Sequence, residues 1–144
     1  MSDDTDDTIA ETETLPLDAW HRRKGARREP FAGYHMPVQY EGIVTEHNWT
    51  RSQAGLFDVS HMGQAELHGA DPALSFERLV PGDITGLAEC RIRYTQLTND
   101  KGGIIDDLMV TRRRDHLFLV VNAGRKDPDY RHIRSRLGDD AILT

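Results

Sequence analysis

The sequence predicts an α+β fold in which an antiparallel sheet meander is flanked by helices. Three strand-like runs follow one another in the chain, at Arg91–Leu97, Ile104–Val110 and His116–Val121. Two polar joints of hairpin length connect them, which favours an antiparallel meander. Helical patterns lie before and after these runs instead of alternating with them, so a parallel βαβ arrangement is not expected.

Acidic residues gather at the start of the chain, and the remainder is formally neutral. Six of the 24 Asp and Glu residues lie in the first 14 positions, which hold no Lys or Arg. Such a segment buries too little apolar area to offset the entropy lost on ordering, so residues 1–14 are predicted to be a disordered acidic tail. The neutral remainder does not favour binding of nucleic acid. No run approaches about 18 consecutive apolar residues, so no membrane span is expected.

Two helices with a proline-containing segment between them are expected in residues 15–55. The first begins at Pro16 and ends at Gly25, a residue suited to a helix C-terminus. Its basic cluster is either a solvated face or a docking patch for an acidic partner. Residues 29–40 hold two prolines and a glycine, so we expect an irregular segment that packs over a core or lines a pocket. The second helix is expected from about Gly42 to Ala54.

Short strands and two helices that begin at Asp-Pro pairs are expected in residues 56–137. Leu56–Val59 and Met62–His68 are predicted to be strands. The Asp-Pro pairs stand at residues 71–72 and 127–128. Each predicts a helix start, because the Asp carboxylate can cap free N–H groups and Pro needs no donor in the first turn.

Two adjacent acidic residues, Asp106 and Asp107, interrupt an otherwise apolar strand. Asp is poorly suited to strands, and such breaks of the local pattern concentrate at functional sites. Strand alternation places Asp107 with Ile105 and Met109 on one face and Asp106 on the other, so the two carboxylates are not expected to act as a pair. A carboxylate in an apolar setting is suited to bind a protonated nitrogen of a ligand. The alternative is an edge strand in which one Asp is solvated and the other bonds to a turn.

Other common site chemistries are not supported by the residue pattern. The seven histidines show no close metal-ligand spacing, so no metal site is expected. Cys90 is the single cysteine, which excludes a disulfide framework within this chain and suits a reducing compartment. Ser60 and His61 lack the flanking glycines of a nucleophile elbow, and no glycine-containing turn matches a phosphate-binding loop.

Four sequence blocks carry a resemblance to a known family. They are Phe31-Ala-Gly-Tyr-His-Met-Pro-Val-Gln-Tyr40, Gly55-Leu-Phe-Asp-Val-Ser-His-Met-Gly63, Asn99-Asp-Lys-Gly-Gly-Ile-Ile-Asp-Asp-Leu108 and Leu119-Val-Val-Asn-Ala123. In this order and at these separations, the blocks closely resemble the N-terminal part of the aminomethyltransferases, or T-proteins, of the glycine cleavage system. The resemblance runs from about Leu15 to the end of the chain. Tyr34 departs from the family pattern, which usually has Trp there.

The resemblance implies an enzyme that uses tetrahydrofolate as a co-substrate and no metal. It implies a partner, the lipoylated H-protein, whose arm delivers an aminomethyl group, and it implies release of ammonia. Asp107 corresponds to the family's key acid, which lies against a folate nitrogen, whereas Asp106 is expected to be structural. Met62, Tyr94 and Asn122 correspond to positions that contact the folate, with Met62 packing on the pterin and Asn122 bonding to its edge as donor and acceptor.

The resemblance also implies that the chain is an incomplete fragment of a three-domain folate-binding fold. Residues 15–55 would be the N-terminal piece of the first folate-binding domain, and residues 56–137 the second α+β domain, which carries the acidic strand. Residues 138–144 would be the truncated start of the return to the first domain. The fragment alone is then expected neither to fold fully nor to be active, because an unfinished core exposes apolar strand edges.

Two other interpretations stay open. One is a non-catalytic folate-binding relative of the type that assists iron–sulfur cluster assembly, which the complete Gly-Gly-Ile-Ile-Asp-Asp block argues against. The other is a tetrahydrofolate-dependent demethylase or the folate domain of a flavoenzyme that oxidises sarcosine or dimethylglycine. The absence of a recognisable targeting signal makes a cytoplasmic location the expectation.

Overall fold

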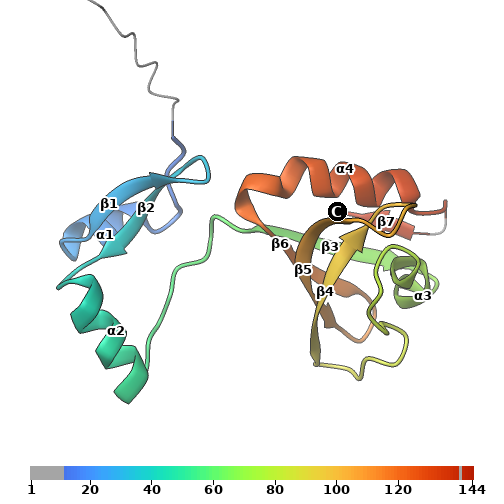
Figure 1. Ribbon diagram of the computed structural model, residues 1–144, viewed down its shortest axis with the longest axis horizontal. Coiled ribbons are helices and arrows are strands. Elements are labelled where there is room, and N and C mark those ends of the chain that lie inside the picture. Colours follow the sequence, from blue (N-terminus) through green and yellow to red (C-terminus); the bar gives the residue numbers. More distant parts are fainter. Residues whose placement is uncertain (1–11, 140) are drawn as a thin grey trace, which may run out of the picture. The chain divides into compact units, whose positions relative to one another are not determined.

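The computed structural model describes residues 12–139 and 141–144 and divides the chain into two compact units (Figure 1). The first unit ends at His61, and the second runs from Met62 to Thr144. The division therefore lies a few residues after the predicted start of the second domain at residue 56.

The predicted acidic tail is only partly described. Residues 1–11 lie outside the described residues. Glu13, which the prediction placed in the disordered tail, is ordered instead. Its N–H donates to the Gly33 carbonyl oxygen at 2.8 Å, and its carbonyl oxygen accepts from the His35 N–H at 2.9 Å. These two backbone hydrogen bonds satisfy groups that would otherwise need water.

Residues 29–40, predicted to be irregular, form most of a β-hairpin. Strand β1 (Arg27–Phe31) pairs antiparallel with β2 (Tyr34–Gln39). The turn residues Ala32 and Gly33 both have positive φ values, 49° and 83°, as in the two-residue turns that match the twist of the strands. The prolines are compatible with this hairpin because, apart from the bridge between Glu13 and Tyr34, the outer sides of β1 and β2 pair with none of the described strands, so no N–H is needed there.

Both helices predicted in the first unit are present, and a buried histidine ties the first of them to later segments. The helices are α1 (Asp18–Arg23) and α2 (Ile43–Ser52). His21 is 4% exposed, and its two ring nitrogens lie 2.6 Å from the Tyr40 hydroxyl and 2.7 Å from Asp58 Oδ2. This polar network joins three segments of the first unit that are far apart in sequence.

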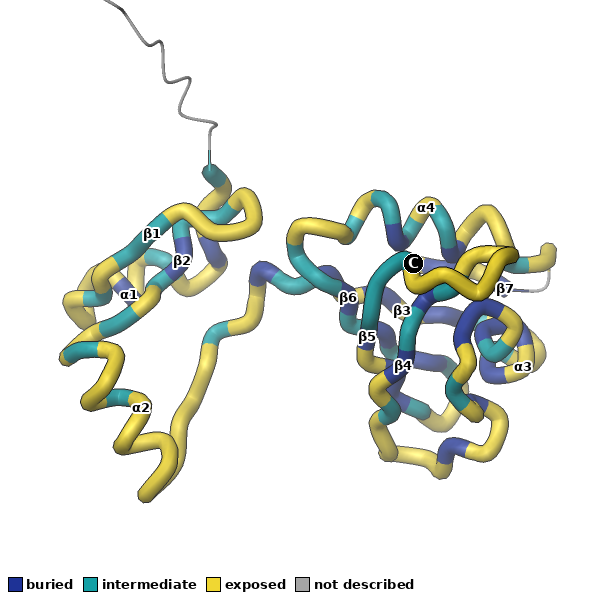
Figure 2. Tube along the Cα trace, in the orientation of Figure 1, coloured by how far each residue is buried: buried dark blue, intermediate teal, exposed yellow. Residues whose placement is uncertain are grey.

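Much of the apolar surface of the first unit is exposed (Figure 2). Helix α2 has no buried residue, and its Ile43, Val44 and Trp49 are all more than half exposed. The prediction of a strand at Leu56–Val59 is wrong, because these residues have no strand assignment and Leu56 is fully exposed. A strand needs a partner strand for its backbone groups, and this segment pairs with none of the described strands.

The second unit is built on a five-stranded antiparallel sheet with the order β4-β5-β6-β3-β7. The strands are β3 (Gly63–Gly69), β4 (Ile92–Thr98), β5 (Ile104–Arg112), β6 (Leu117–Val121) and β7 (Ala141–Leu143). The predicted meander is confirmed as β4-β5-β6. The sequence interpretation made residues 138–144 the return to the first domain, but here β7 pairs with β3, whose outer edge would otherwise lack backbone hydrogen bonds.

The two helices of the second unit differ in how they begin. Helix α3 (Pro72–Glu77) starts as predicted, and the Asp71 carboxylate accepts a backbone N–H hydrogen bond at 3.0 Å. Helix α4 (Lys126–Arg136) follows the 3-10 turn η1 (Ala123–Arg125) and has no side-chain cap. The prediction that Asp127 caps it is wrong. The chain already turns helically after β6, which places Asp127 within the first turn.

One face of the sheet carries the core, and the other is more open. Helix α4 lies along the core face (Figure 1), where Phe76 of α3 and Ile133 of α4 are fully buried. They belong to one cluster of buried apolar residues to which every strand of the sheet contributes. On the opposite face, Tyr94 and Met109 are 58% and 45% exposed. None of the described helices has the length and apolar character needed to cross a membrane.

Candidate functional site

Strand β5 contains an irregularity directly before its two acidic residues. Ile104 pairs with Thr98 of β4, but the next residue of β4 in the register, Leu97, pairs with Asp106, so Ile105 is an extra residue. Such a bulge shifts the alternation of faces. Ile105 consequently packs against the core, although regular strand alternation predicts it on the face of Asp107.

Beyond the bulge, strand alternation is regular. Leu108 and Val110 are buried on the core face, while Met109 is largely exposed on the other. Asp106 therefore shares the core face with Leu108, and Asp107 shares the open face with Met109. The prediction that the two Asp residues belong to opposite faces agrees with this arrangement.

The two carboxylates are nevertheless joined by one amide, which the prediction of separate roles did not foresee. Asn122 follows β6, and its Nδ2 donates to Asp107 Oδ1 at 2.8 Å and to Asp106 Oδ1 at 3.0 Å. It also lies 3.3 Å from the Asp107 carbonyl oxygen. The Asp107 N–H donates to Asp106 Oδ1 at 2.9 Å. Asp107 is thus held by a neutral amide donor, which adds no positive charge of its own beside the carboxylate.

A third carboxyl group, Asp129 of α4, contacts Asp106 from the core side. Burial raises the pKa of Asp129 to about 7, and its hydrogen bond to Asp106 and the charges of Asp106 and Asp107 act in the same direction. Burial also opposes ionisation of Asp106. The hydrogen bonds that Asp106 accepts from Asp107, Asp129 and Asn122 outweigh this effect and hold its pKa below the ordinary value.

The open face beside Asp107 has one polar neighbour, Gln96, and then an aromatic and an apolar side chain. Asp107 pairs with Gln96 of β4, and two residues further along, Met109 lies between Tyr94 of β4 and Val120 of β6. Residues two apart on a strand share a face, so Tyr94 and Met109 form a partly exposed surface next to the carboxylate. A flat ring can pack on such a surface.

Met62 lies beside Asn122, although their side chains are not joined by hydrogen bonds. Met62 directly precedes β3, whose first residue, Gly63, pairs with Val121 of β6. The antiparallel register therefore brings Met62 to the level of Asn122. The structure thus places the four predicted site residues Met62, Tyr94, Asp107 and Asn122 on four neighbouring segments at one end of the open face.

Two residues at this end of the sheet were not singled out from the sequence. Asp129 resembles an ordinary acid in the first turn of a helix, and nothing in the sequence shows that it is buried. Gly63 is required by close packing, because a Cβ there would lie about 2.6 Å or less from side-chain atoms of Val121, Lys126 and Tyr130. In the sequence, a glycine at the start of a strand only weakly indicates that other side chains pack closely against the backbone there.

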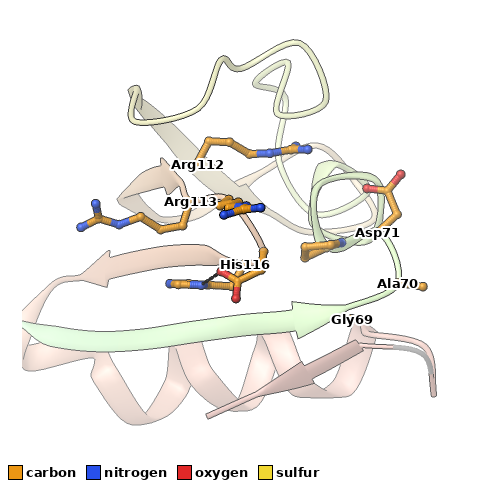
Figure 3. A pocket seen from close by; sticks show the side chains of 9 residues that line it. Gly69, Ala70, Asp71, Arg112, Arg113 and His116 are labelled. Atoms are coloured by element: carbon orange, nitrogen blue, oxygen red, sulfur yellow. Dashed lines mark hydrogen bonds and ion pairs between the residues drawn. The ribbon is translucent and has the colours of Figure 1, made fainter.

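The other end of the sheet carries a separate hollow of about 420 Å³ (Figure 3). It is lined by the turn between β5 and β6, including Arg112, Arg113 and His116, and by the start of α3 at Asp71. None of the predicted site residues lines it. Among the described residues, no group of three His, Cys, Asp or Glu side chains is arranged to hold a metal ion.

The fold and the site define a class of protein in which an antiparallel α+β unit presents an amide-fixed carboxylate beside an exposed aromatic surface. Residues 17–144 match the family model described as the GCVT N-terminal domain. Because the match spans most of the chain, the chain belongs to this family, and the resemblance found in the sequence is confirmed.

Curated relatives and a solved structure agree with this assignment. The chain is 44% identical over 128 residues to the mitochondrial aminomethyltransferase of Dictyostelium discoideum, covering 88% of the chain and 32% of the relative. It is 44% identical over 123 residues to an aminomethyltransferase of Desulfitobacterium hafniense, covering 85% of the chain and 34% of the relative. The crystal structure of glycine cleavage system aminomethyltransferase T from Bartonella henselae matches with a TM-score of 0.85 and 36% identity, covering 91% of the chain and 37% of that chain. The chain thus spans about a third of the length of these relatives.

Proposed function

We propose that this chain provides the Asp107 site of an aminomethyltransferase of the glycine cleavage system. The reaction transfers a one-carbon unit from an aminomethyl-lipoyl carrier protein to tetrahydrofolate and releases ammonia. Family membership and the names of the relatives support this proposal. The observation that carries it is the contact of Asn122 with both Asp106 and Asp107, because it fixes a carboxylate at the edge of an open aromatic surface.

Each predicted site residue has a role that its chemistry allows. The Asp107 carboxylate would accept a hydrogen bond from a nitrogen of tetrahydrofolate and orient it. Tyr94 and Met109 would provide the surface on which the ring system packs, and Met62 would contact it from β3. The N–H groups of Asn122 already bind the two aspartates. This leaves its carbonyl oxygen as the group offered to the ligand, instead of both donor and acceptor as expected from the sequence.

The proposed transfer is balanced without any oxidant or metal. A tetrahydrofolate nitrogen forms a bond to the methylene carbon as the bond from that carbon to the amino nitrogen breaks. The second folate nitrogen then forms its bond to the carbon as the carbon–sulfur bond breaks. The two protons lost from the folate nitrogens pass to the released ammonia and to the lipoyl sulfur. Asp107 would contribute by positioning the nucleophilic nitrogen rather than by forming a covalent bond.

The two alternative functions are less well supported. A non-catalytic folate-binding relative would not need a carboxylate fixed in this way, and the relatives described above are named aminomethyltransferases. A lipoylated H-protein is the partner that this activity requires. The cytoplasmic location expected from the sequence remains a prediction, because one relative is named as mitochondrial.

Binding of tetrahydrofolate is the first test. We expect the 144-residue chain to bind tetrahydrofolate in anaerobic calorimetry, and Asp107→Asn to weaken binding by about tenfold, as expected for loss of one charge-assisted hydrogen bond. Asp115→Asn is the matched control, because Asp115 lies on the turn before β6, at the opposite end of that strand from Asn122. Equal affinities for the wild type and Asp107→Asn would remove Asp107 from the site.

The transfer activity needs a second assay. Ammonia release from an aminomethyl-lipoyl carrier protein would be followed with and without tetrahydrofolate, using the 144-residue chain or a longer polypeptide that contains it. We expect release to depend on tetrahydrofolate and to be slower in Asp107→Asn than in Asp115→Asn. Tetrahydrofolate binding without any effect on ammonia release would favour the non-catalytic alternative.

A further inference from the structure

Asp129 is completely buried, and its carboxyl group lacks the donors that a buried carboxylate needs. In the described part of the chain, no N–H or basic side chain donates to either of its oxygens. Oδ2 of Asp106 is also buried and also has no such donor. The partner left for these buried oxygens is the other carboxyl group, because a hydrogen bond between Asp106 and Asp129 lowers the pKa of Asp106 and raises that of Asp129. Two carboxylates cannot form such a bond, so one of the two groups must carry a proton.

The surroundings show which of the two carries the proton. Asp106 accepts hydrogen bonds from Asn122 and from the Asp107 backbone, and both favour its charged form. Asp129 accepts no comparable bond and is more deeply buried, which favours its neutral form. Asp129 is therefore the donor, and Asp106 is the acceptor.

We propose that Asp129 is a positioning residue of the site, a neutral carboxylic acid that donates to Asp106 and thereby holds the Asn122 amide where it fixes Asp107. The side chains of Asp129, Asp106 and Asn122 thus connect the core side of the sheet to Asp107 on the open face. Because the residue acts on the Asp107 site, the inference rests on the proposed function and deepens it.

This arrangement makes the site sensitive to pH near neutrality. The charged groups that act on Asp129 are Asp106 and Asp107 of β5 and Arg125 of η1. Burial and the two aspartates raise its pKa to about 7, while Arg125 opposes the shift. Below this pH the donor is present. As the pH rises above it, a third negative charge appears beside Asp106 and the hydrogen bond to Asp106 is lost, so ligand affinity should fall.

The first test needs no ligand. The side-chain amide signals of Asn122, identified by their loss in Asn122→Ala, would be followed by nitrogen–proton NMR in the 144-residue chain as the pH is raised. We expect them to shift with a midpoint close to the pKa of Asp129, about 7. In Asp129→Asn, which keeps a donor but cannot ionise, they should not shift, whereas the matched control Asp127→Asn should behave like the wild type. Signals that titrate equally in Asp129→Asn would overturn the proposal.

A direct titration keeps the proposal testable if Asp129→Asn does not fold. The carboxyl carbon of Asp129 can be followed by carbon NMR in the wild type alone. A midpoint near 7 is expected from its burial and its neighbours. A midpoint near the ordinary value of Asp, about 4, would show that the group is ionised at neutral pH and would overturn the proposal.

The second test measures binding of tetrahydrofolate across the same pH range. In the wild type, affinity should fall by about fivefold from about pH 6 to about pH 8, as expected if binding raises the pKa of Asp129 by one unit. The ligand's own titration is common to both proteins and is subtracted. After this correction, the affinity of Asp129→Asn for tetrahydrofolate should stay constant within about twofold. A wild-type pH profile in Asp129→Asn would contradict the inference. If the amide signals behave as expected but no tetrahydrofolate binds, the proposed function fails while the positioning of Asn122 by Asp129 stands.

Discussion

Asn122 connects the two acidic residues that make β5 unusual. Its amide donates to Asp106 and Asp107 at 3.0 and 2.8 Å, and both carboxylates are partly buried. A hydrogen bond to a charged group contributes roughly 1.5–3 kcal/mol, and removing the donor leaves the acceptors unsatisfied. Asn122 is therefore expected to matter for stability as well as for the site.

We expect Asn122→Ala to lower the free energy of unfolding by about 2 kcal/mol, because two partly buried carboxylates lose their shared donor. The measurement is urea unfolding of the 144-residue chain, followed by circular dichroism. Gln64→Ala is the control, since Gln64 is exposed on the neighbouring strand β3. A loss no larger than that of the control would show that the amide contributes nothing to stability.

At the residue scale, the sequence indicates that Asp107 belongs to a functional site but gives no such indication for Asp129. Asp107 stands out because it breaks the apolar pattern of a strand. Acidic residues are rare in strands, and such breaks concentrate at functional sites. Asp129 stands in the first turn of a helix, where acids are common, so its burial depends on how α4 packs against β5. Asp106 was expected to be structural, and its contacts with Asn122 and Asp129 give that expectation a physical basis.

Helix α3 shows how a local signal can determine an element. The helix has six residues, too few to form in isolation, and Asp71 satisfies one of its free N–H groups. We expect Asp71→Ala to lower the free energy of unfolding by about 1 kcal/mol, whereas Asp71→Asn, which retains a side-chain acceptor, should cost much less. Urea unfolding of both variants measures the difference. Equal losses would mean that the charge, rather than the cap, stabilises the helix start.

The elements that were mispredicted depend on contacts beyond their own sequence. The prolines of residues 29–40 predict an irregular segment, yet the two-stranded ribbon β1-β2 tolerates them and the turn at residues 32–33 supplies the required positive φ values. The Asp-Pro pair at residues 127–128 correctly predicts helix α4 but not its first residue, because the 3-10 turn η1 already begins the helical turn before it. The segment 56–59 has the composition of a strand, but it pairs with none of the described strands.

At the scale of the whole molecule, the two units differ in how much core they have. The second unit contains one continuous cluster of sixteen buried apolar residues. In the described part of the first unit, only Leu15 and Met36 are buried apolar residues. The family resemblance was recognised from four short blocks spread over both units, because their order and spacing are specific even though no single block is. The position of β7 could not be predicted in this way, since it depends on pairing with β3.

This difference predicts unequal protection of backbone amides from hydrogen exchange. Amides of β6, which lies between β5 and β3, should exchange only when the second unit opens. Amides of α2, which has no buried residue, should exchange at least about a hundredfold faster. Exchange of the 144-residue chain at neutral pH, read by NMR for each residue, measures both. Slow exchange in α2 equal to that in β6 would contradict the expectation that the chain alone does not fold fully, because it would require the first unit to be stabilised by more than its own few buried apolar side chains.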